Sequence, residues 1–334
     1  MARAARRHWM GRNEGDDGGF GGEGREPGAA DGEAGWAMKV GLMAPQGWKR
    51  EYAGWDPAAA WERTVALARD AERLGFESLW VFDHFHTVPL PTDEMTLESF
   101  STITALAMVT TRMRLGHMVI CTAFRNPALT AKLASTIDVI SGGRFELGIG
   151  AGWKEDEWRA YGYGFPPIAE RLAVLGDHLE VVKRMLAPGR ATFEGTHASV
   201  RGAINEPKGI QARIPIIIGG NGRNVTLRYA ARYADEANLV YLDPTEVAEL
   251  LPVIRQRCEE IDRDPSTLKV SLYVGDDDIR AVGQERVDML GAFDRLGLSR
   301  LVCFPSRWDL SLEGQERFAE DCRSADLDLL AAMA

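Results

Sequence analysis

Eight short apolar runs alternate with longer segments of helical periodicity from residue 38 onward, and this alternation constrains the fold most strongly. Leu172, Leu175 and Leu179, for example, are spaced as expected for one face of a helix. Strands that alternate with helices form parallel sheets, and eight such units are typical of a (β/α)8 TIM barrel of the α/β class. The predicted strands are Lys39–Met43, Ser78–Phe82, Met113–Cys121, Phe145–Ile149, Ile214–Ile218, Glu236–Val240, Lys269–Val274 and Arg300–Phe304.

Two segments depart from this alternation. Residues 1–37 contain paired glycines, several acids and a basic run without an apolar period, so we expect a flexible N-terminal extension before a single barrel over 38–334. Residues 187–213 lack helical periodicity, and two short runs within them predict a β-hairpin insertion between the fourth helix and the fifth strand. Long insertions in barrels usually form lids or packing flaps.

The composition of the chain limits which binding partners and which cellular compartment are expected. The formal net charge of -10 argues against a nucleic-acid partner, which would need clustered basic residues. No apolar run approaches the roughly 18 residues that would span a bilayer, and the basic start lacks the apolar region of a secretory signal. The cysteines form no Cys-x-x-Cys pair, so we predict a cytoplasmic protein with reduced thiols at Cys121, Cys258, Cys303 and Cys322.

Polar residues at the carboxyl ends of the predicted strands are the candidates for chemistry, because active sites of α/β barrels lie there. The second strand ends in Asp83 and His84, and His86 follows two residues later. An imidazole titrates near neutral pH and can exchange a proton at a reacting carbon. The adjacent Asp can accept a hydrogen bond from a planar heterocycle. A helix cap or a hydrogen-bonded loop pair is the alternative interpretation.

His84 and His86 also form a His-x-His pair, which binds zinc in metal-dependent hydrolase barrels. In those barrels the pair lies on the first strand, and further His and Asp ligands follow on later strands. Here the last predicted strand ends in Cys303-Phe304-Pro305, without an acid. We therefore predict no metal site.

Glycine-rich turns follow two further strands. The run from Gly148 to Gly152 would let a flat ligand approach the backbone closely, and the charged residues 154–157 after it are expected to be mostly solvated. The run from Gly219 to Gly222 precedes a helix, whose N-terminal N–H groups and dipole favour an anion. A plain tight turn is the alternative, but three glycines at the catalytic face favour a phosphate site.

These motifs together resemble the luciferase-like monooxygenase superfamily, specifically its branch of deazaflavin (coenzyme F420)-dependent oxidoreductases. The resemblance implies a TIM barrel with an insertion near its carboxyl face. It also implies a cofactor stacked on a bulge in the third strand, often at a non-prolyl cis peptide, which by position is Met118-Val119. The matching segments are Leu79–Phe85, Phe124–Leu129, Asp138–Arg144, Glu146–Trp153 and Pro215–Asp235.

The resemblance also implies roles for single residues. Asp83 would contact the deazaflavin ring system, and His84 would act as the acid/base or transition-state stabiliser. Trp153 stands where the sugar-phosphate dehydrogenases carry a proton-donating glutamate, which favours an apolar or aromatic substrate. The implied cofactor-binding residues are Asp83, Met118, Val119, Cys121, Gly150, Gly152, Gly219, Gly220, Asn221 and Gly222, and the expected substrate pocket comprises Trp48, Trp153, His86 and the loops 46–55 and 187–213.

The leading hypothesis is a coenzyme F420-dependent oxidoreductase that moves a hydride between the deazaflavin and a small organic substrate. A two-component FMN-dependent monooxygenase, which would need a separate flavin or F420 reductase, shares the same barrel, and the Asp83–His84 pair favours the deazaflavin. A catalytically silent flavin-binding protein and a metal-dependent hydrolase are further alternatives. Members of the family often dimerise, so the resemblance also allows a homodimer.

Overall fold

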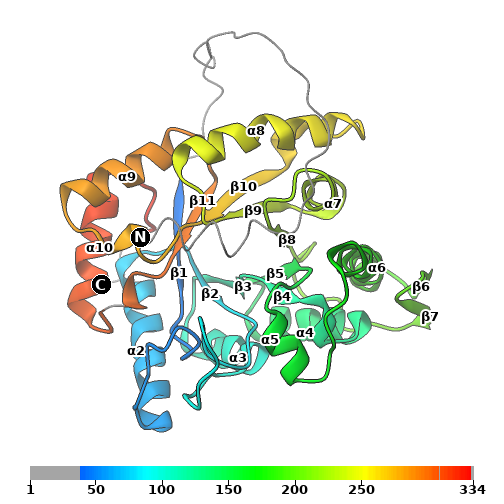
Figure 1. The fold of residues 1–334 in the computed structure, drawn as a ribbon, viewed down its shortest axis with the longest axis horizontal. Helices are drawn as coiled ribbons and strands as arrows, with labels where there is room; N and C mark the ends of the chain where they lie inside the picture. The colour runs from blue at the N-terminus through cyan, green and yellow to red at the C-terminus, as the bar shows by residue number, and fades with distance from the viewer. Residues whose placement is uncertain (1–37, 308, 332–334) are drawn as a thin grey trace.

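The predicted (β/α)8 barrel is confirmed by a computed structural model, which describes residues 38–307 and 309–331 (Figure 1). The strand segments follow the order β3-β2-β1-β11-β10-β9-β8-β5-β4, and β3 also pairs with β5, which closes the sheet. Every pairing around this barrel is parallel. The predicted extension 1–37 lies outside the described residues.

The strands agree with the predicted ranges to within two residues, except for the third. This strand is divided into β3 (Arg114–His117) and β4 (Ile120–Cys121), and the Met118-Val119 peptide between them is cis, as the resemblance implied. The other barrel strands are β1 (Lys39–Met43), β2 (Ser78–Val81), β5 (Phe145–Gly150), β8 (Ile216–Gly219), β9 (Glu236–Val240), β10 (Lys269–Tyr273) and β11 (Arg300–Cys303).

Helices surround the barrel and bury the outer faces of its strands. Because both faces are covered, β2, β5 and β11 are buried at every position. A capping asparagine at Asn126 and a proline at the first helical position explain why one helix begins at Pro127. The helices are α2 (Pro57–Leu74), α3 (Ser99–Val109), α4 (Pro127–Ile140), the short α5 (Glu155–Ala160), α6 (Ile168–Leu186), α7 (Thr226–Tyr233), α8 (Pro244–Glu259), α9 (Gln284–Asp294) and α10 (Leu312–Ser324).

A buried ionic cluster fills the amino-terminal end of the barrel interior. The Arg300 guanidinium pairs with Glu146 at 2.9 Å, Glu77 at 3.0 Å and Glu236 at 3.2 Å, and all four side chains come from the beginnings of strands or the residue before one. Burial by itself raises the pKa of Glu146, but Arg300 and Arg114 outweigh it and hold that pKa below its usual value. The cluster occupies this end of the barrel, which leaves the carboxyl end for a site.

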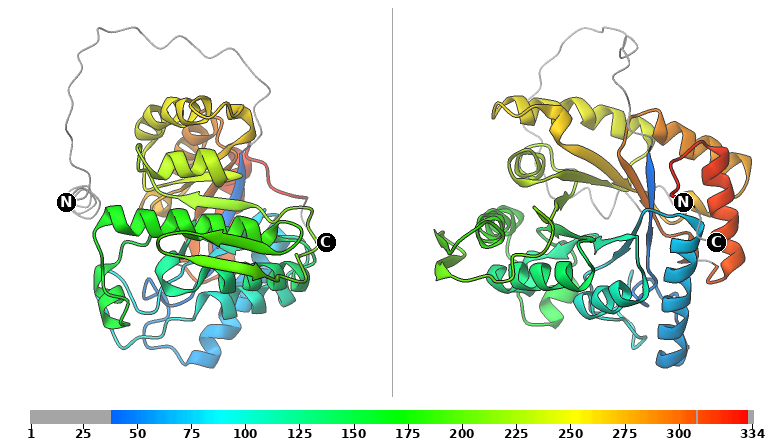
Figure 2. Two further views of the ribbon diagram at one scale, coloured as in Figure 1. Left: turned by 90° about the vertical axis from the view of Figure 1, so that its right-hand side faces the viewer. Right: turned by 180° about the vertical axis from the view of Figure 1, so that it is seen from behind.

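The predicted hairpin insertion is confirmed, but its expected position near the carboxyl face is wrong. The antiparallel strands β6 (Ala191–Glu194) and β7 (Ser199–Ala203) lie at the outer edge of the molecule beside α6 (Figures 1 and 2). Farther along the insertion, the Gln211 amide bonds to Arg114 and to the carbonyl oxygen of Phe145, the first residues of β3 and β5. The chain returns from a helix to the next strand at the amino end of a barrel, so the insertion begins and ends on the side opposite the expected substrate pocket, while the tip of its hairpin reaches Asp177 in the middle of α6.

Candidate active site

His84 lies just beyond β2, and its imidazole is held by neighbours from two segments, the loop after β1 and the loop and short helix after β5. Its Nδ1 atom is 2.8 Å from Oε2 of Glu157, and its ring stacks on Trp48 with centroids 4.1 Å apart and planes 4° apart. Trp153 approaches the ring edge-on at 5.6 Å. Because an ionised carboxylate only accepts hydrogen bonds, this pair places a proton on Nδ1 and leaves Nε2 as the basic nitrogen.

Glu157 is a candidate site residue that the sequence analysis missed. It lies on α5, is fully buried, and accepts the backbone N–H of Phe85 at 2.7 Å through its second oxygen. The expectation that residues 154–157 mostly face solvent is wrong for Glu157 and for Lys154, which is 3% exposed. The one signal in the sequence is Trp158, since a large aromatic residue beside Glu157 indicates that this part of the helix faces the core.

Asp83 is buried, and its carboxylate accepts four hydrogen bonds from within the protein. Arg125 donates to both oxygens at 2.7 and 2.9 Å, Ser99 donates through its hydroxyl at 2.7 Å, and the Cys121 N–H donates at 2.8 Å. These contacts join the end of β2 to β4 and to the start of α3. Arg125 lies in one of the segments that carry the family resemblance, yet nothing in the sequence indicated that it would pair with Asp83.

The Val119 side chain occupies the space beside three glycines of the barrel mouth. A Cβ atom added at Gly148, Gly150 or Gly219 would lie 3.0, 2.7 or 3.1 Å from its methyl groups. A ligand at this position would therefore meet Val119 in place of the expected bare backbone of Gly150. Gly152 is similar, because its added Cβ would lie 2.5 Å from the Cys121 sulfur.

The turn from Gly219 to Gly222 connects β8 to α7. The Asn221 amide exchanges two hydrogen bonds with the backbone of Val240, at 2.9 and 3.0 Å, which attaches the turn to the end of β9. Gly220 has a φ of 131°, a conformation that disfavours other residues. Within the described residues no side chain caps the start of α7 at Thr226, and the Leu227 N–H donates to the Gly222 carbonyl at 3.0 Å. The remaining N–H groups at a helix start are typical binding partners for an anion.

The floor of the barrel mouth is apolar, while its rim carries the polar groups. Trp48 is 4% exposed and packs on Phe82 at 4.3 Å between ring centroids, whereas Trp153 is 44% exposed. His86 is half-buried at the rim, where burial and the nearby Lys154 lower its pKa. The buried residues of the floor are Met43, Trp48, Trp80, Phe82, Met118, Ile217, Tyr273, Val302 and Phe304.

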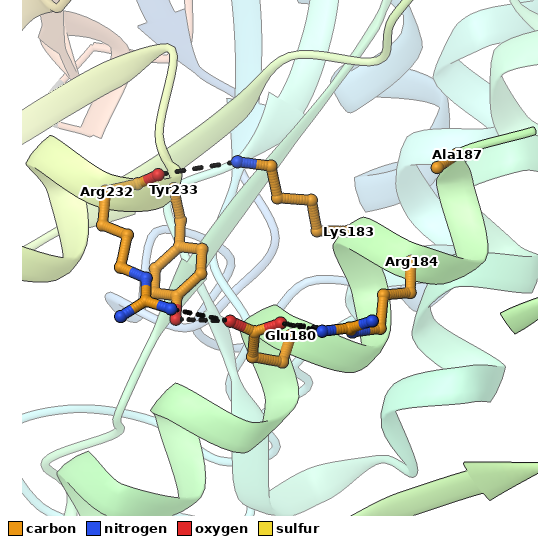
Figure 3. Close-up of a pocket in the computed structure, with 6 residues that line it drawn as sticks. All are labelled: Glu180, Lys183, Arg184, Ala187, Arg232 and Tyr233. Atoms are coloured by element: carbon orange, nitrogen blue, oxygen red, sulfur yellow. Dashed lines mark hydrogen bonds and ion pairs between the residues drawn. The ribbon is translucent and has the colours of Figure 1, made fainter. Parts of the chain in front are cut away.

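A separate cavity of about 350 Å³ lies between the last turns of α6 and α7 (Figure 3). Within it Glu180 accepts a hydrogen bond from the Tyr233 hydroxyl at 2.8 Å and pairs with Arg184 and Arg232. These helix ends are at the amino side of the barrel, far from the strand ends that carry His84. The cavity is lined by Glu180, Lys183, Arg184, Ala187, Arg232 and Tyr233, and of these only Ala187 belongs to a segment, 187–213, that was expected to line a substrate pocket.

Two features are absent from the part of the chain that the structure describes. No group of three or more His, Cys, Asp or Glu side chains there is arranged to hold a metal ion. None of the described helices is both long enough and apolar enough to cross a membrane.

Sequence comparisons identify a family and several relatives. The family model of the luciferase-like monooxygenases matches residues 38–283. The F420-dependent glucose-6-phosphate dehydrogenase of Kineococcus radiotolerans is 30% identical over 233 residues, 66% of each chain. The pyrimidine monooxygenase RutA of Stutzerimonas stutzeri is 31% identical over 205 residues, 59% of this chain and 56% of that protein. An uncharacterized Mycobacterium tuberculosis protein is also 30% identical, over 186 residues that make up 51% of this chain and 65% of that protein. The chain thus spans less than two thirds of the length of each of these curated relatives.

Solved structures share the fold at low sequence identity. An F420-dependent secondary alcohol dehydrogenase in complex with an F420-acetone adduct aligns with a TM-score of 0.72 at 18% identity, over 86% of this chain and 99% of that chain. The oxygenating constituent of 3,6-diketocamphane monooxygenase from Pseudomonas putida, in complex with FMN, aligns with a TM-score of 0.65 at 16% identity, over 88% and 99%. At these identities the likeness shows the barrel fold alone.

Proposed function

Since the chain belongs to the luciferase-like monooxygenase family, we propose that it is an oxidoreductase that uses coenzyme F420 and acts on a small apolar or aromatic substrate. The proposal is that a hydride moves between the deazaflavin and the substrate. The F420-dependent dehydrogenase among the relatives supports this cofactor. The single observation that carries the proposal is the contact between His84 and the buried Glu157 at the end of β2.

This pair suits hydride chemistry at a carbon that bears oxygen. When a hydride leaves an alcohol carbon, the hydroxyl must lose its proton, and in the reverse direction the carbonyl oxygen must gain one. His84 offers a basic Nε2 for that proton, and Glu157 would stabilise the imidazolium that forms. Trp48 behind the imidazole and Trp153 at its edge hold the ring in place.

The residues of the barrel mouth fit a flavin-like cofactor. The apolar floor around Phe82, Met118 and Val119 suits a planar ring, and the turn at Gly220 with the uncapped start of α7 suits a phosphate. When bound, the cofactor would supply the hydride chemistry, while the protein orients it and excludes water. Asp83 would act from behind this floor by holding Arg125 and the backbone of Cys121 in place.

An FMN-dependent monooxygenase is the second candidate. RutA among the relatives and the FMN complex among the structural neighbours favour it, and the FMN complex has the fold described here. In that case a separate reductase would have to supply the reduced flavin. The two candidates share the barrel and the phosphate turn, so the choice depends on which ring system the mouth binds.

Titration of the full chain with coenzyme F420 and with FMN, each oxidised and reduced, tests the proposal. Sub-micromolar binding of F420 together with weak binding of FMN is the expected result. Tight binding of FMN alone would instead favour the monooxygenase. If neither cofactor binds, both candidates are wrong. The alternative of a catalytically silent flavin-binding protein is then wrong as well, because it also requires cofactor binding.

A further inference from the structure

The loop after β1 carries Trp48 to the face of the His84 imidazole. The two rings lie parallel, with centroids 4.1 Å apart, and Trp48 is 4% exposed. The indole N–H is buried and has no acceptor among the described residues. The indole is thus not fixed by a hydrogen bond to this part of the chain, and its position depends on packing and on the backbone of residues 46–51.

Glu51 binds that backbone on both sides of Trp48. Its Oε1 atom accepts the N–H groups of Gln46 at 2.7 Å and Gly47 at 2.8 Å, and its Oε2 atom accepts the N–H group of Lys49 at 2.9 Å. An ionised carboxylate only accepts hydrogen bonds, and here the loop backbone supplies donors in place of water. Burial raises the pKa of Glu51, and the hydrogen bonds from the backbone oppose that rise. The charge of Glu51 is therefore stabilised by the loop that it organises.

A second residue of the loop, Gln46, attaches it to the strand end that carries His84. The Phe82 N–H donates to the side-chain oxygen of Gln46 at 2.6 Å, and the Gln46 amide donates to the Phe82 carbonyl oxygen at 3.1 Å. Phe82 precedes His84 in the chain, and Val88, which follows it, donates its N–H to the Trp48 carbonyl oxygen at 2.9 Å. The loop is therefore joined to the chain on both sides of His84, and a displacement of its backbone would change how the indole meets the imidazole.

We propose that Glu51 is a positioning residue, which fixes the Trp48 indole against the His84 imidazole by holding the peptide groups before and after Trp48. The sequence analysis placed Glu51 in a loop of the expected substrate pocket but gave it no role. Glu157 contacts one ring nitrogen of His84 and Trp48 covers one face, so the two contacts together restrict rotation of the imidazole. The inference rests on the proposed function, because the orientation of this ring affects catalysis only if His84 carries the proton.

The carbon-bound ring protons of His84 report this stacking in a proton NMR spectrum of the full chain, without cofactor or substrate. They are assigned by their absence from the spectrum of His84→Asn. An indole face shifts the protons of a ring stacked on it upfield, and Trp48→Leu should abolish that shift. Glu51→Gln preserves the shape of the side chain but turns an NH2 group toward at least one of the backbone N–H groups, because an amide has a single acceptor oxygen. It should therefore remove most of the upfield shift.

Glu72→Gln is the matched control. Glu72 also accepts hydrogen bonds from a loop backbone, from the Thr111 N–H at 2.8 Å and the Met113 N–H at 3.0 Å, but this loop precedes β3 at the amino end of the barrel. The variant makes the same charge change and should lower the free energy of unfolding, measured with urea, about as much as Glu51→Gln does. The ring protons of His84 should not move in it, which separates positioning from a general loss of stability.

Glu51→Asp keeps the charge but is shorter by one methylene group, so its carboxylate cannot reach the N–H groups on both sides of Trp48. It should shift the His84 protons in the same direction as Glu51→Gln, and it decides the test if Glu51→Gln does not fold. Unchanged His84 protons in the folded Glu51 variants, or an equal change in Glu72→Gln, would overturn the inference, as would a Trp48→Leu spectrum identical to that of the native chain. Because no cofactor is present, these outcomes are independent of the cofactor titration that tests the proposed function.

Discussion

Replacing Glu157 by glutamine should invert the tautomer of His84. In the native chain Glu157 accepts hydrogen bonds from Nδ1 of His84 at 2.8 Å and from the Phe85 backbone at 2.7 Å. Glutamine offers one acceptor oxygen and one donor group in place of two acceptors. Since the Phe85 N–H belongs to the backbone and cannot turn away, the glutamine oxygen must face it. The amide NH2 then donates to Nδ1, and the His84 proton moves to Nε2.

The size of the effect follows from the bond that is lost. Glu157 is fully buried, so water cannot replace the carboxylate as the partner of His84. A hydrogen bond to a charged group contributes about 1.5–3 kcal/mol, and 1.36 kcal/mol corresponds to a tenfold change in rate, so turnover should fall about 10- to 150-fold. Cofactor affinity should change less than about threefold, because in the proposed arrangement neither residue holds the phosphate.

Nitrogen-15 NMR of the histidine rings measures the tautomer directly, before any substrate is known. The protonated and unprotonated ring nitrogens of a neutral imidazole resonate far apart, and the spectrum of His84→Asn identifies the His84 signals among the 6 histidines. Glu155→Gln is the matched control, since it makes the same charge change on the same helix in an exposed pair with Arg159. Native His84 with its proton on Nε2, or an unchanged tautomer in Glu157→Gln, would refute the reasoning. So would an equal shift in Glu155→Gln.

Three further predictions address the phosphate turn, acid stability and the ionic cluster. Gly220→Val should weaken a phosphorylated cofactor far more than its dephosphorylated analogue, and equal weakening in a binding titration would contradict the phosphate assignment. Burial lowers the pKa of His117 to about 4, so the stability that its neutral ring provides is present above about pH 6.5 and is lost as the pH falls toward 4. Between pH 7 and pH 4 the unfolding free energy of His117→Phe, measured with urea, should therefore fall by about 3 kcal/mol less than that of the native chain. The same pH profile in both proteins would show that His117 does not cause the loss of stability in acid. Arg300→Met should lower the free energy of unfolding by about 3–5 kcal/mol because it leaves three buried carboxylates without their cation. Arg213→Met, which breaks an exposed pair with Asp235, should cost less than about 1 kcal/mol, and similar losses in the two variants would show that burial does not set the cost.

Much of the fold was predictable because it depends on short-range patterns. A parallel strand that is covered on both faces must be apolar at every position, so β2 and β5 are visible as continuous apolar runs. The cap at Asn126 and the proline after it likewise depend only on neighbouring residues. His84 could be singled out for the same reason, since a polar break at the end of such a strand is a local feature.

The partners of these residues were not predictable. Glu157 meets His84 from 73 positions away, and Lys49 meets Asp276 from 227 positions away. Within the four charged residues 154–157 themselves nothing shows which one turns inward, and the neighbouring Trp158 is the one signal, because the orientation depends on how the short helix α5 packs on the barrel. The space beside Gly150 was misjudged for a similar reason, since Val119 reaches it from another strand.

The sequence by itself thus determined the barrel, the family and the strand end at which a histidine meets the mouth. Only the tertiary structure decided that Glu157 contacts this histidine, that Asp83 is engaged with Arg125, and that the hairpin insertion packs beside α6 on the outside of the barrel. The physical reason is the separation in sequence between the residues that interact. Hydrophobic periodicity and capping act between residues a few positions apart, whereas the contacts of a site form between loops that closure of the sheet brings together.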